Sequence, residues 1–151
     1  MVSRSDQRKS RRHQEFFYDL EIALCEAISI HVRYETPDEK GSTRRERNES
    51  FNVPSPEFEI PEGGEFLWTA YFQISDGLRR IDDGVCFPIP WSEFLAWAKV
   101  LDHVVTSDEY VILRAMDAAF CEETNKELQA YHERRAEDQR REIEAAKRGR
   151  R

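Results

Sequence analysis

The 151-residue sequence contains few of the residues that metal sites and covalent cross-links need. Its three cysteines, Cys25, Cys86 and Cys121, lie far apart, form no C-x-x-C pair and have no histidine at metal-ligand spacing. The four histidines include no H-E-x-x-H pattern. Such a set does not predict a metal site, and each cysteine is expected to pack as a small apolar side chain.

Long apolar runs and phosphate-binding loops are missing as well. No stretch approaches the ~20 apolar residues that a membrane-spanning helix needs, and no apolar segment of a secretory signal follows the basic start. We therefore expect a soluble, cytoplasmic protein. There is no dinucleotide fingerprint and no G-x-S-x-G, and Gly63-Gly64 is typical of the turn before a helix. We predict no cofactor, and an enzyme is the least favoured class.

Charged residues are abundant, at 35 % of the chain, and their signs are unevenly distributed. Residues 1–12 are basic, residues 13–121 carry nine basic against twenty-one acidic side chains, and residues 122–151 are nearly balanced. A nucleic-acid-binding domain needs a concentrated basic patch on its folded surface. An acidic body therefore disfavours nucleic acid as a partner, and its basic ends are typical of solvating tails.

The spacing of apolar residues predicts a mainly α protein, a small helical bundle with a long loop or short strands in its N-terminal third. The chain divides into a disordered basic tail (1–14), an N-terminal helix or strand element with a long connection (15–63), a helical core (64–121) and a charged helical extension or tail (122–151).

The N-terminal element begins with apolar residues three and four positions apart, which predict a helix to about residue 27: Phe17, Leu20, Leu24, Ala27 and Ile28. From Ile28 to Tyr34 apolar and polar residues alternate, which is typical of a half-buried strand; a continued helix is the alternative. Residues 36–64 hold four of the six prolines and predict a long loop with one short extended piece around residues 58–60.

Three helices are predicted within residues 64–121. The first has an apolar seam from Leu67 to Ile81 with Gly77 inside it, the second follows a pair of prolines, and the third opens with the capping box Thr106–Glu109. Short turns join these helices, so their apolar faces are expected to meet in one cluster. The cluster is predicted to contain Leu67, Trp68, Phe72, Trp91, Phe94, Leu113, Met116 and Phe120.

Two side chains beside these apolar faces are candidates for a special role. Asp117 flanks the apolar stripe of the third helix, and we expect it to be a partly buried carboxylate paired with Arg79, Arg80 or Arg114. Trp97 lies off the apolar face of the second helix. An exposed tryptophan on a helix is a candidate contact for a partner protein, with a place in the core as the alternative.

Residues 66–121 resemble the small tail-assembly proteins of long-tailed bacteriophages. The order and spacing of short patterns carry the resemblance: Phe66-Leu67-Trp68, Tyr71-Phe72-Gln73-Ile74-Ser75, Leu78-Arg79, Pro88-Ile89-Pro90-Trp91-Ser92-Glu93, Ala96-Trp97 and Leu113-Arg114-Ala115-Met116-Asp117-Ala118-Ala119-Phe120. The most specific part is an L-x-x-M-D-x-A-[YF] pattern that follows a P-I-x-x-x-E-x-x-A-W pattern.

The resemblance implies a tail assembly chaperone, a non-enzymatic protein of the host cytoplasm. Its expected partners are the tape-measure protein, which it keeps soluble, and the tail-tube protein, whose subunits it helps to recruit; self-association is left open. A client with exposed apolar helix faces needs a helical partner with an apolar surface rimmed by charge. Partner contacts are predicted at Trp68, Tyr71, Trp97 and Tyr110, and structural roles at Trp91, Phe94, Met116, Asp117 and Phe120.

Two other functions remain as alternatives. One is a different accessory protein of the tail or of head completion. The other is a small nucleic-acid-binding regulator, because the helix that opens at Thr106 follows its predecessor after a short link, as in a helix-turn-helix. Between Ser107 and Cys121, however, that helix has Arg114 as its single basic side chain, so the phosphates of DNA would not attract it.

Overall fold

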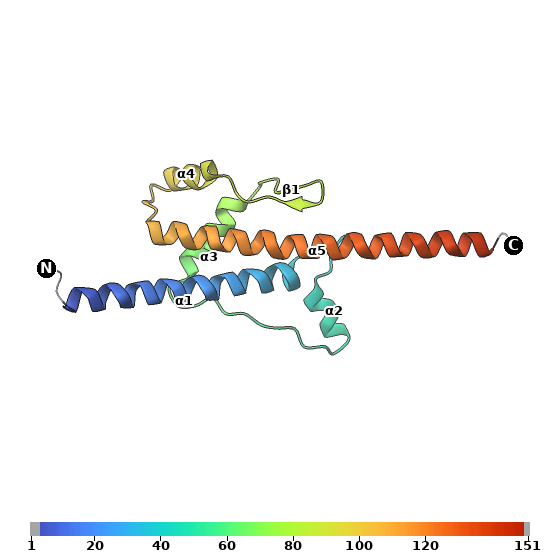
Figure 1. Ribbon diagram of the computed structural model, residues 1–151, viewed down its shortest axis with the longest axis horizontal. Helices are drawn as coiled ribbons and strands as arrows, with labels where there is room; N and C mark the ends of the chain where they lie inside the picture. Colours follow the sequence, from blue (N-terminus) through green and yellow to red (C-terminus); the bar gives the residue numbers. More distant parts are fainter. Residues whose placement is uncertain (1–3, 150–151) are drawn as a thin grey trace.

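The computed structural model describes residues 4–149, and side chains from Arg11 onward. The fold is mainly α, as predicted, with five helices and one small two-stranded sheet in the described residues. The elements are α1 (Arg4–Glu35), α2 (Arg44–Ser50), α3 (Glu65–Ser75), β1 (Ile81–Asp82), β2 (Val85–Cys86), α4 (Trp91–Val100) and α5 (Ser107–Arg148) (Figure 1). None of the described helices is long and apolar enough to cross a membrane.

The two long helices, α1 and α5, lie side by side and run in the same direction (Figure 1). Polar contacts mark the register at both ends: His13 lies 3.2 Å from Asp108, and Arg33 lies 3.9 Å from Glu127. A parallel pair within one chain needs a long connection that returns to the starting end. Residues 36–106 are that connection, and they carry every other element.

Helix α1 continues through the segment for which the sequence left strand and helix open. Ile28 and Val32, four residues apart, are both buried in the core, whereas strand periodicity would pair Ile28 with Ile30. The helix ends at Glu35 because Pro37 disfavours helical geometry at the residue before it. The disordered tail predicted for residues 1–14 is also corrected, since α1 begins at Arg4; residues 1–3 lie outside the described residues.

Helix α2 lies in the region predicted to be a loop. Thr43 accepts a hydrogen bond from the backbone N–H of Glu46, and the Glu46 side chain accepts one from the N–H of Thr43. This capping box supports a seven-residue helix that buries none of its residues. Ion pairs hold the helix in place instead, including Arg44 with Glu127 at 2.6 Å and Arg45 with Glu35.

Helix α3 is shorter than its predicted seam. It ends at Ser75, and Gly77 adopts a left-handed backbone conformation (φ 71°) that stops the helix. Ile81, expected on the buried seam, is exposed in β1. At the other end, Gly64 packs so tightly that an added Cβ would come within 3.2 Å of the Leu20 side chain of α1.

The short strands β1 and β2 form an antiparallel hairpin that packs on α5. Asp83 and Gly84 join them, both with positive φ, which is the geometry of a two-residue hairpin turn. The sequence placed possible strands in the N-terminal third, and the structure places them here instead. A Cβ added to Gly84 would lie 3.0 Å from the His132 ring, so a glycine at this position lets the turn approach α5.

Helix α5 begins at the predicted capping box of Thr106 and Glu109 and continues for 42 residues. Its contacts with the body extend past Cys121 as far as Tyr131, which donates a hydrogen bond to Glu39, and His132. From residue 132 to residue 149 every side chain is exposed, and this part of the helix projects beyond the other elements (Figure 1).

The core draws on α1 as well as on the three predicted helices. Leu67, Phe94, Leu113 and Met116 are buried together as predicted, with Trp68, Phe72 and Phe120 packed partly buried against them. Trp91 is the exception, because it is exposed to solvent. Four side chains of α1 complete the cluster: Leu20, Leu24, Ile28 and Val32.

Leu24→Ala tests the contribution of α1 to this core. Leu24 is fully buried, so its truncation should lower the free energy of unfolding by about 2–5 kcal/mol. The matched control is Ile22→Ala on the same helix, an exposed position where the loss should stay below about 1 kcal/mol. Denaturant unfolding followed by circular dichroism measures both values. Equal losses for the two variants would show that α1 does not pack as described.

Candidate functional site

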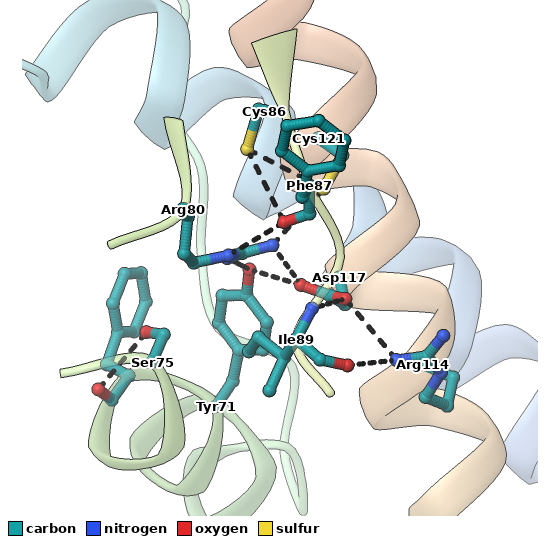
Figure 2. A network of polar contacts seen from close by, with 10 residues as sticks. Tyr71, Ser75, Arg80, Cys86, Phe87, Ile89, Arg114, Asp117 and Cys121 are labelled. Carbon is teal, nitrogen blue, oxygen red and sulfur yellow. Dashed lines mark hydrogen bonds and ion pairs between the residues drawn. The ribbon is translucent and has the colours of Figure 1, made fainter. Parts of the chain in front are cut away.

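A buried polar network joins the segment after α3 to α5, with Asp117 at its centre (Figure 2). One carboxylate oxygen of Asp117, Oδ1, binds the Arg80 guanidinium and accepts a hydrogen bond from the Tyr71 hydroxyl at 3.3 Å. The other, Oδ2, accepts the backbone N–H of Ile89 at 2.8 Å and lies 3.5 Å from Arg114. The sequence predicted a paired Asp117, and its partners are two of the three arginines proposed, Arg80 and Arg114.

Arg80 uses all three of its nitrogens in this network. Its Nε donates to the carbonyl of Phe87 at 3.2 Å, Nη1 donates to the Tyr71 hydroxyl at 2.9 Å, and Nη2 reaches both Asp117 and the sulfur of Cys121. The guanidinium carbon also lies 4.6 Å from the centre of the Phe120 ring. The Arg80 side chain is 8 % exposed and that of Asp117 1 %, so the pair is enclosed and well satisfied.

Tyr71 is part of this network and not part of the surface. Its side chain is fully buried, which corrects the prediction that it contacts a partner. Burial raises the pKa of its hydroxyl, an effect that the nearby Arg80 only partly offsets. Tyr71 therefore keeps its proton, accepts from Arg80 and donates to Asp117. Because Asp117, Arg80 and Tyr71 satisfy one another, the arrangement fixes residues 80–89 against α5.

A second group of side chains forms an aromatic cluster where α1, α3 and the segment before α3 meet. His31, Phe58, Trp68 and Phe72 lie with ring centres 5.1–6.1 Å apart, and all four are half-buried. Burial lowers the pKa of His31 more than Glu35 raises it, so the imidazole is neutral at pH 7. Trp68 and Phe72 also line an open depression of about 650 Å³ with Phe120.

Aromatic side chains gather again around α4. The indole N–H of Trp97 donates to Gln73 at 3.0 Å. The rings of Trp97, Phe66 and His103 all pack against one another, with ring centres 4.9–6.1 Å apart. Trp97 is half-buried, which lies between the two predicted alternatives of an exposed partner contact and a place in the core. Trp91 stacks on Tyr110 with 4.0 Å between the ring centres. Trp91 was predicted to be structural, but it covers Tyr110 from the solvent side.

Several exposed apolar side chains lie on α4 and the turn that follows it. Of the predicted apolar face of α4, only Phe94 is buried. Leu95 is 67 % exposed, Val100 83 % and Val104 85 %, and Trp91 and Leu101 are also exposed. We call these five residues the α4 patch. Exposed apolar side chains gathered on one segment are typical of a surface that a partner covers.

A groove of about 820 Å³ lies between the end of α1, α2 and the middle of α5. Its apolar floor includes Val32, Phe120 and Leu128, and its rim carries both basic and acidic side chains. Glu127 on the rim pairs with Arg44 and with Arg33. The described residues contain no group of three or more His, Cys, Asp or Glu side chains that could hold a metal ion.

Sequence reasoning missed two parts of this site. It did not identify the α4 patch. The spacing of Trp91, Leu95 and Leu101 predicts that they share one face of a helix, but it does not distinguish a face buried in the core from a face exposed to solvent. It also did not find that Cys86 and Cys121 meet, since the two lie on elements brought together only by the fold. The other predicted partner contacts, Trp68, Trp97 and Tyr110, are half-buried at two separate places.

Comparison with known proteins places the middle of the chain in one family. A sequence profile described as phage tail assembly chaperone matches residues 44–122, which cover α2, α3, the hairpin, α4 and α5 up to Glu122. The matched segment contains the buried polar network and the α4 patch but not α1. No curated protein and no solved structure matches the chain.

Asp117→Ala tests the buried network. The substitution leaves the enclosed Arg80 guanidinium without its counter-charge and the Ile89 N–H without its acceptor, so we expect the free energy of unfolding to fall by about 3–5 kcal/mol. The exposed pair of Arg79 and Asp82 supplies the control, because Asp82→Ala should change stability by less than about 1 kcal/mol. Chemical denaturation compares the two. A mild effect of Asp117→Ala would contradict the described network.

His31 predicts a pH dependence of stability. Its pKa is lowered in the folded protein, so below the unfolded value of about 6.5 the unfolded chain binds the proton more readily. This contribution to stability is therefore fully present above pH 6.5 and is progressively lost as the pH falls below that value. We expect His31→Gln to show a shallower loss of stability over that range than the wild type, measured by unfolding at a series of pH values. Parallel profiles would show that His31 does not titrate as inferred.

Proposed function

The chain belongs to the phage tail assembly chaperone family, which gives it a role in the assembly of phage tails, and we propose that its client is the tape-measure protein. In this proposal the protein covers apolar helix faces of the client in the host cytoplasm and helps tail-tube subunits to assemble around it. One observation carries the proposal: α4 buries a single residue and exposes the α4 patch.

The α4 patch has the chemistry that such a client needs. A long client with apolar helix faces self-associates unless those faces are covered. The patch offers aliphatic side chains and the exposed ring of Trp91, without a charged side chain among its five members. Trp97, on the same helix, is proposed as a further contact, and Tyr110 is proposed to contribute by supporting the exposed ring of Trp91, on which it stacks.

Charge around the patch favours a soluble complex. The chain carries a net charge of −7, and its acidic excess lies in residues 13–121, where twenty-one acidic side chains face nine basic ones. The projecting end of α5 adds a fully exposed helix with both signs of charge, including the pair Glu137 and Arg141. A complex whose free surface stays charged resists aggregation while the apolar faces are covered.

We propose a non-enzymatic mechanism, because binding accounts for the features of the site. Both oxygens of Asp117 accept hydrogen bonds from the chain itself. This buried carboxylate therefore has a structural role, in which it holds residues 80–89 against α5. The alternative of a nucleic-acid-binding regulator finds no support at Arg114. Its Nη1 donates to the carbonyl of Ile89 at 2.8 Å and lies 3.5 Å from Asp117, so this guanidinium is engaged within the chain.

The double substitution Leu95→Ser and Val104→Ser tests the α4 patch. Both side chains are largely exposed, so the fold should remain intact while the apolar contact with the client is lost. We expect binding of tape-measure fragments to weaken at least about tenfold, equivalent to roughly 1.4 kcal/mol. Pull-down and a binding titration measure the effect, with circular dichroism confirming the helical fold.

Ile143→Ser is the matched control for this experiment. Ile143 is also an exposed aliphatic residue, but it lies on the projecting end of α5. Its substitution should leave client binding unchanged. If the control weakened binding as much as the double variant, the surface would be wrongly assigned. If well-folded wild-type protein captured no tape-measure fragment, the proposed client would be wrong.

A further inference from the structure

Two free thiols from separate elements face each other beside the polar network. Cys86 ends the hairpin strand β2 and is buried, and Cys121 lies on α5 and is partly exposed. Their sulfur atoms are 3.7 Å apart although the residues are 35 positions apart in the chain. Figure 2 shows the two side chains directed toward one another above the Arg80 guanidinium.

Neighbouring contacts hold this thiol pair in position. The backbone N–H of Cys86 donates to Oδ1 of Asn125 at 2.7 Å, and Asn125 lies one turn after Cys121 on the same face of α5. On the other side, Nη2 of Arg80 lies 3.2 Å from the sulfur of Cys121. The backbone of one cysteine and the sulfur of the other are therefore both anchored. The pair does not depend on a chance meeting of two mobile side chains.

We propose that Cys86 and Cys121 form a site of reversible covalent modification, at which a small disulfide such as glutathione disulfide oxidises them to an intramolecular disulfide. A disulfide needs the sulfur atoms to approach to about 2.05 Å, so each must move by less than an ångström from its present place. Side-chain rotation within the existing packing supplies a movement of that size. The bond would join the hairpin to α5 and enclose α4 in a covalent loop.

The reaction proceeds by two thiol–disulfide exchanges. The thiolate of Cys121, the more exposed partner, attacks one sulfur of glutathione disulfide and releases one glutathione, which takes up the proton that Cys121 lost. The thiolate of Cys86 then attacks the sulfur of Cys121 in this mixed disulfide and releases the second glutathione with its proton. Two protein thiols lose two electrons in total, and one glutathione disulfide gains them.

The environment of Cys121 sets the pace of the first exchange. Burial raises the pKa of Cys121 to about 12, the neighbouring Cys86 and Asp117 add to the rise, and the adjacent Arg80 offsets only part of it. The thiolate is therefore scarce at neutral pH, and the rate should increase about tenfold for each pH unit between pH 7 and 9. The thiols stay reduced in a reducing cytoplasm and respond when a disulfide oxidant accumulates.

The experiment treats the reduced full chain with glutathione disulfide at pH 8.5 and traps remaining thiols with N-ethylmaleimide. Peptide mapping without reduction should find one linkage, between Cys86 and Cys121. Cys25 in α1 provides the control. Like Cys121 it is half-buried, and burial raises its pKa to about 11, but it is not part of the thiol pair. Cys25→Ser should therefore form the same linkage as the wild type. Cys86→Ser and Cys121→Ser should not form it, and Cys121 in Cys86→Ser should stop at the glutathione adduct.

Thermal unfolding gives a second readout. The oxidised wild type should melt about 5–10 °C higher than the reduced protein, and dithiothreitol should reverse the shift. Circular dichroism of Cys86→Ser before oxidation verifies that the variant is folded. The proposal is overturned by a linkage that involves Cys25, by a glutathione adduct that persists in the wild type, or by no reaction at all. Client binding does not enter either readout, so the outcome is independent of the proposed function.

Discussion

The aliphatic stripe of α1 can leave water only by packing on α5 and α3, and this requirement organises the whole molecule. Leu20, Leu24, Ile28 and Val32 join the buried side chains of the other helices in one core. The burial of each such side chain contributes roughly 1.5–3 kcal/mol, so the stripe supplies a large share of a marginal total stability. Because α1 and α5 run parallel, the connection between them must cross the full length of the body, and the hairpin and α4 are carried on it.

The polar network solves a problem that this crossing creates. Residues 76–90 leave helical structure and pass over α5, so their backbone groups cannot all bond within a helix or a sheet. Asp117 accepts the N–H of Ile89, Arg114 donates to its carbonyl, and Arg80 donates to the carbonyl of Phe87. A charged pair in this place stabilises a particular path of the chain, which aliphatic packing alone would leave undefined.

Local signals in the sequence were reliable where a few neighbouring residues decide the structure. The capping box of Thr106 and Glu109 predicts the start of α5 correctly, and the same signature at Thr43 and Glu46 would have predicted α2. Gly77 was placed inside a helix because the apolar spacing continues past it, whereas its positive φ ends α3. The exposure of Trp91 depends on which elements come to lie beside α4, and no local pattern carries that information. The α4 patch could not be predicted from the sequence for the same reason. The pairing of Asp117 could be predicted, because a carboxylate beside an apolar stripe is expected to have a charged partner.

The parallel pairing of α1 and α5 has a consequence for the order of events during synthesis. His13 meets Asp108, 95 residues later in the chain, so α1 leaves the ribosome long before its packing partner exists. At bacterial translation speeds of about 5–20 residues per second, the aliphatic stripe of α1 stays without its packing partner for roughly 5–20 s. During that interval the nascent chain is itself a polypeptide with an uncovered helix face. Folding of this protein can be completed only when the last body-contacting turns of α5 have been translated, and it requires the closure of a long loop in addition to the formation of the helices.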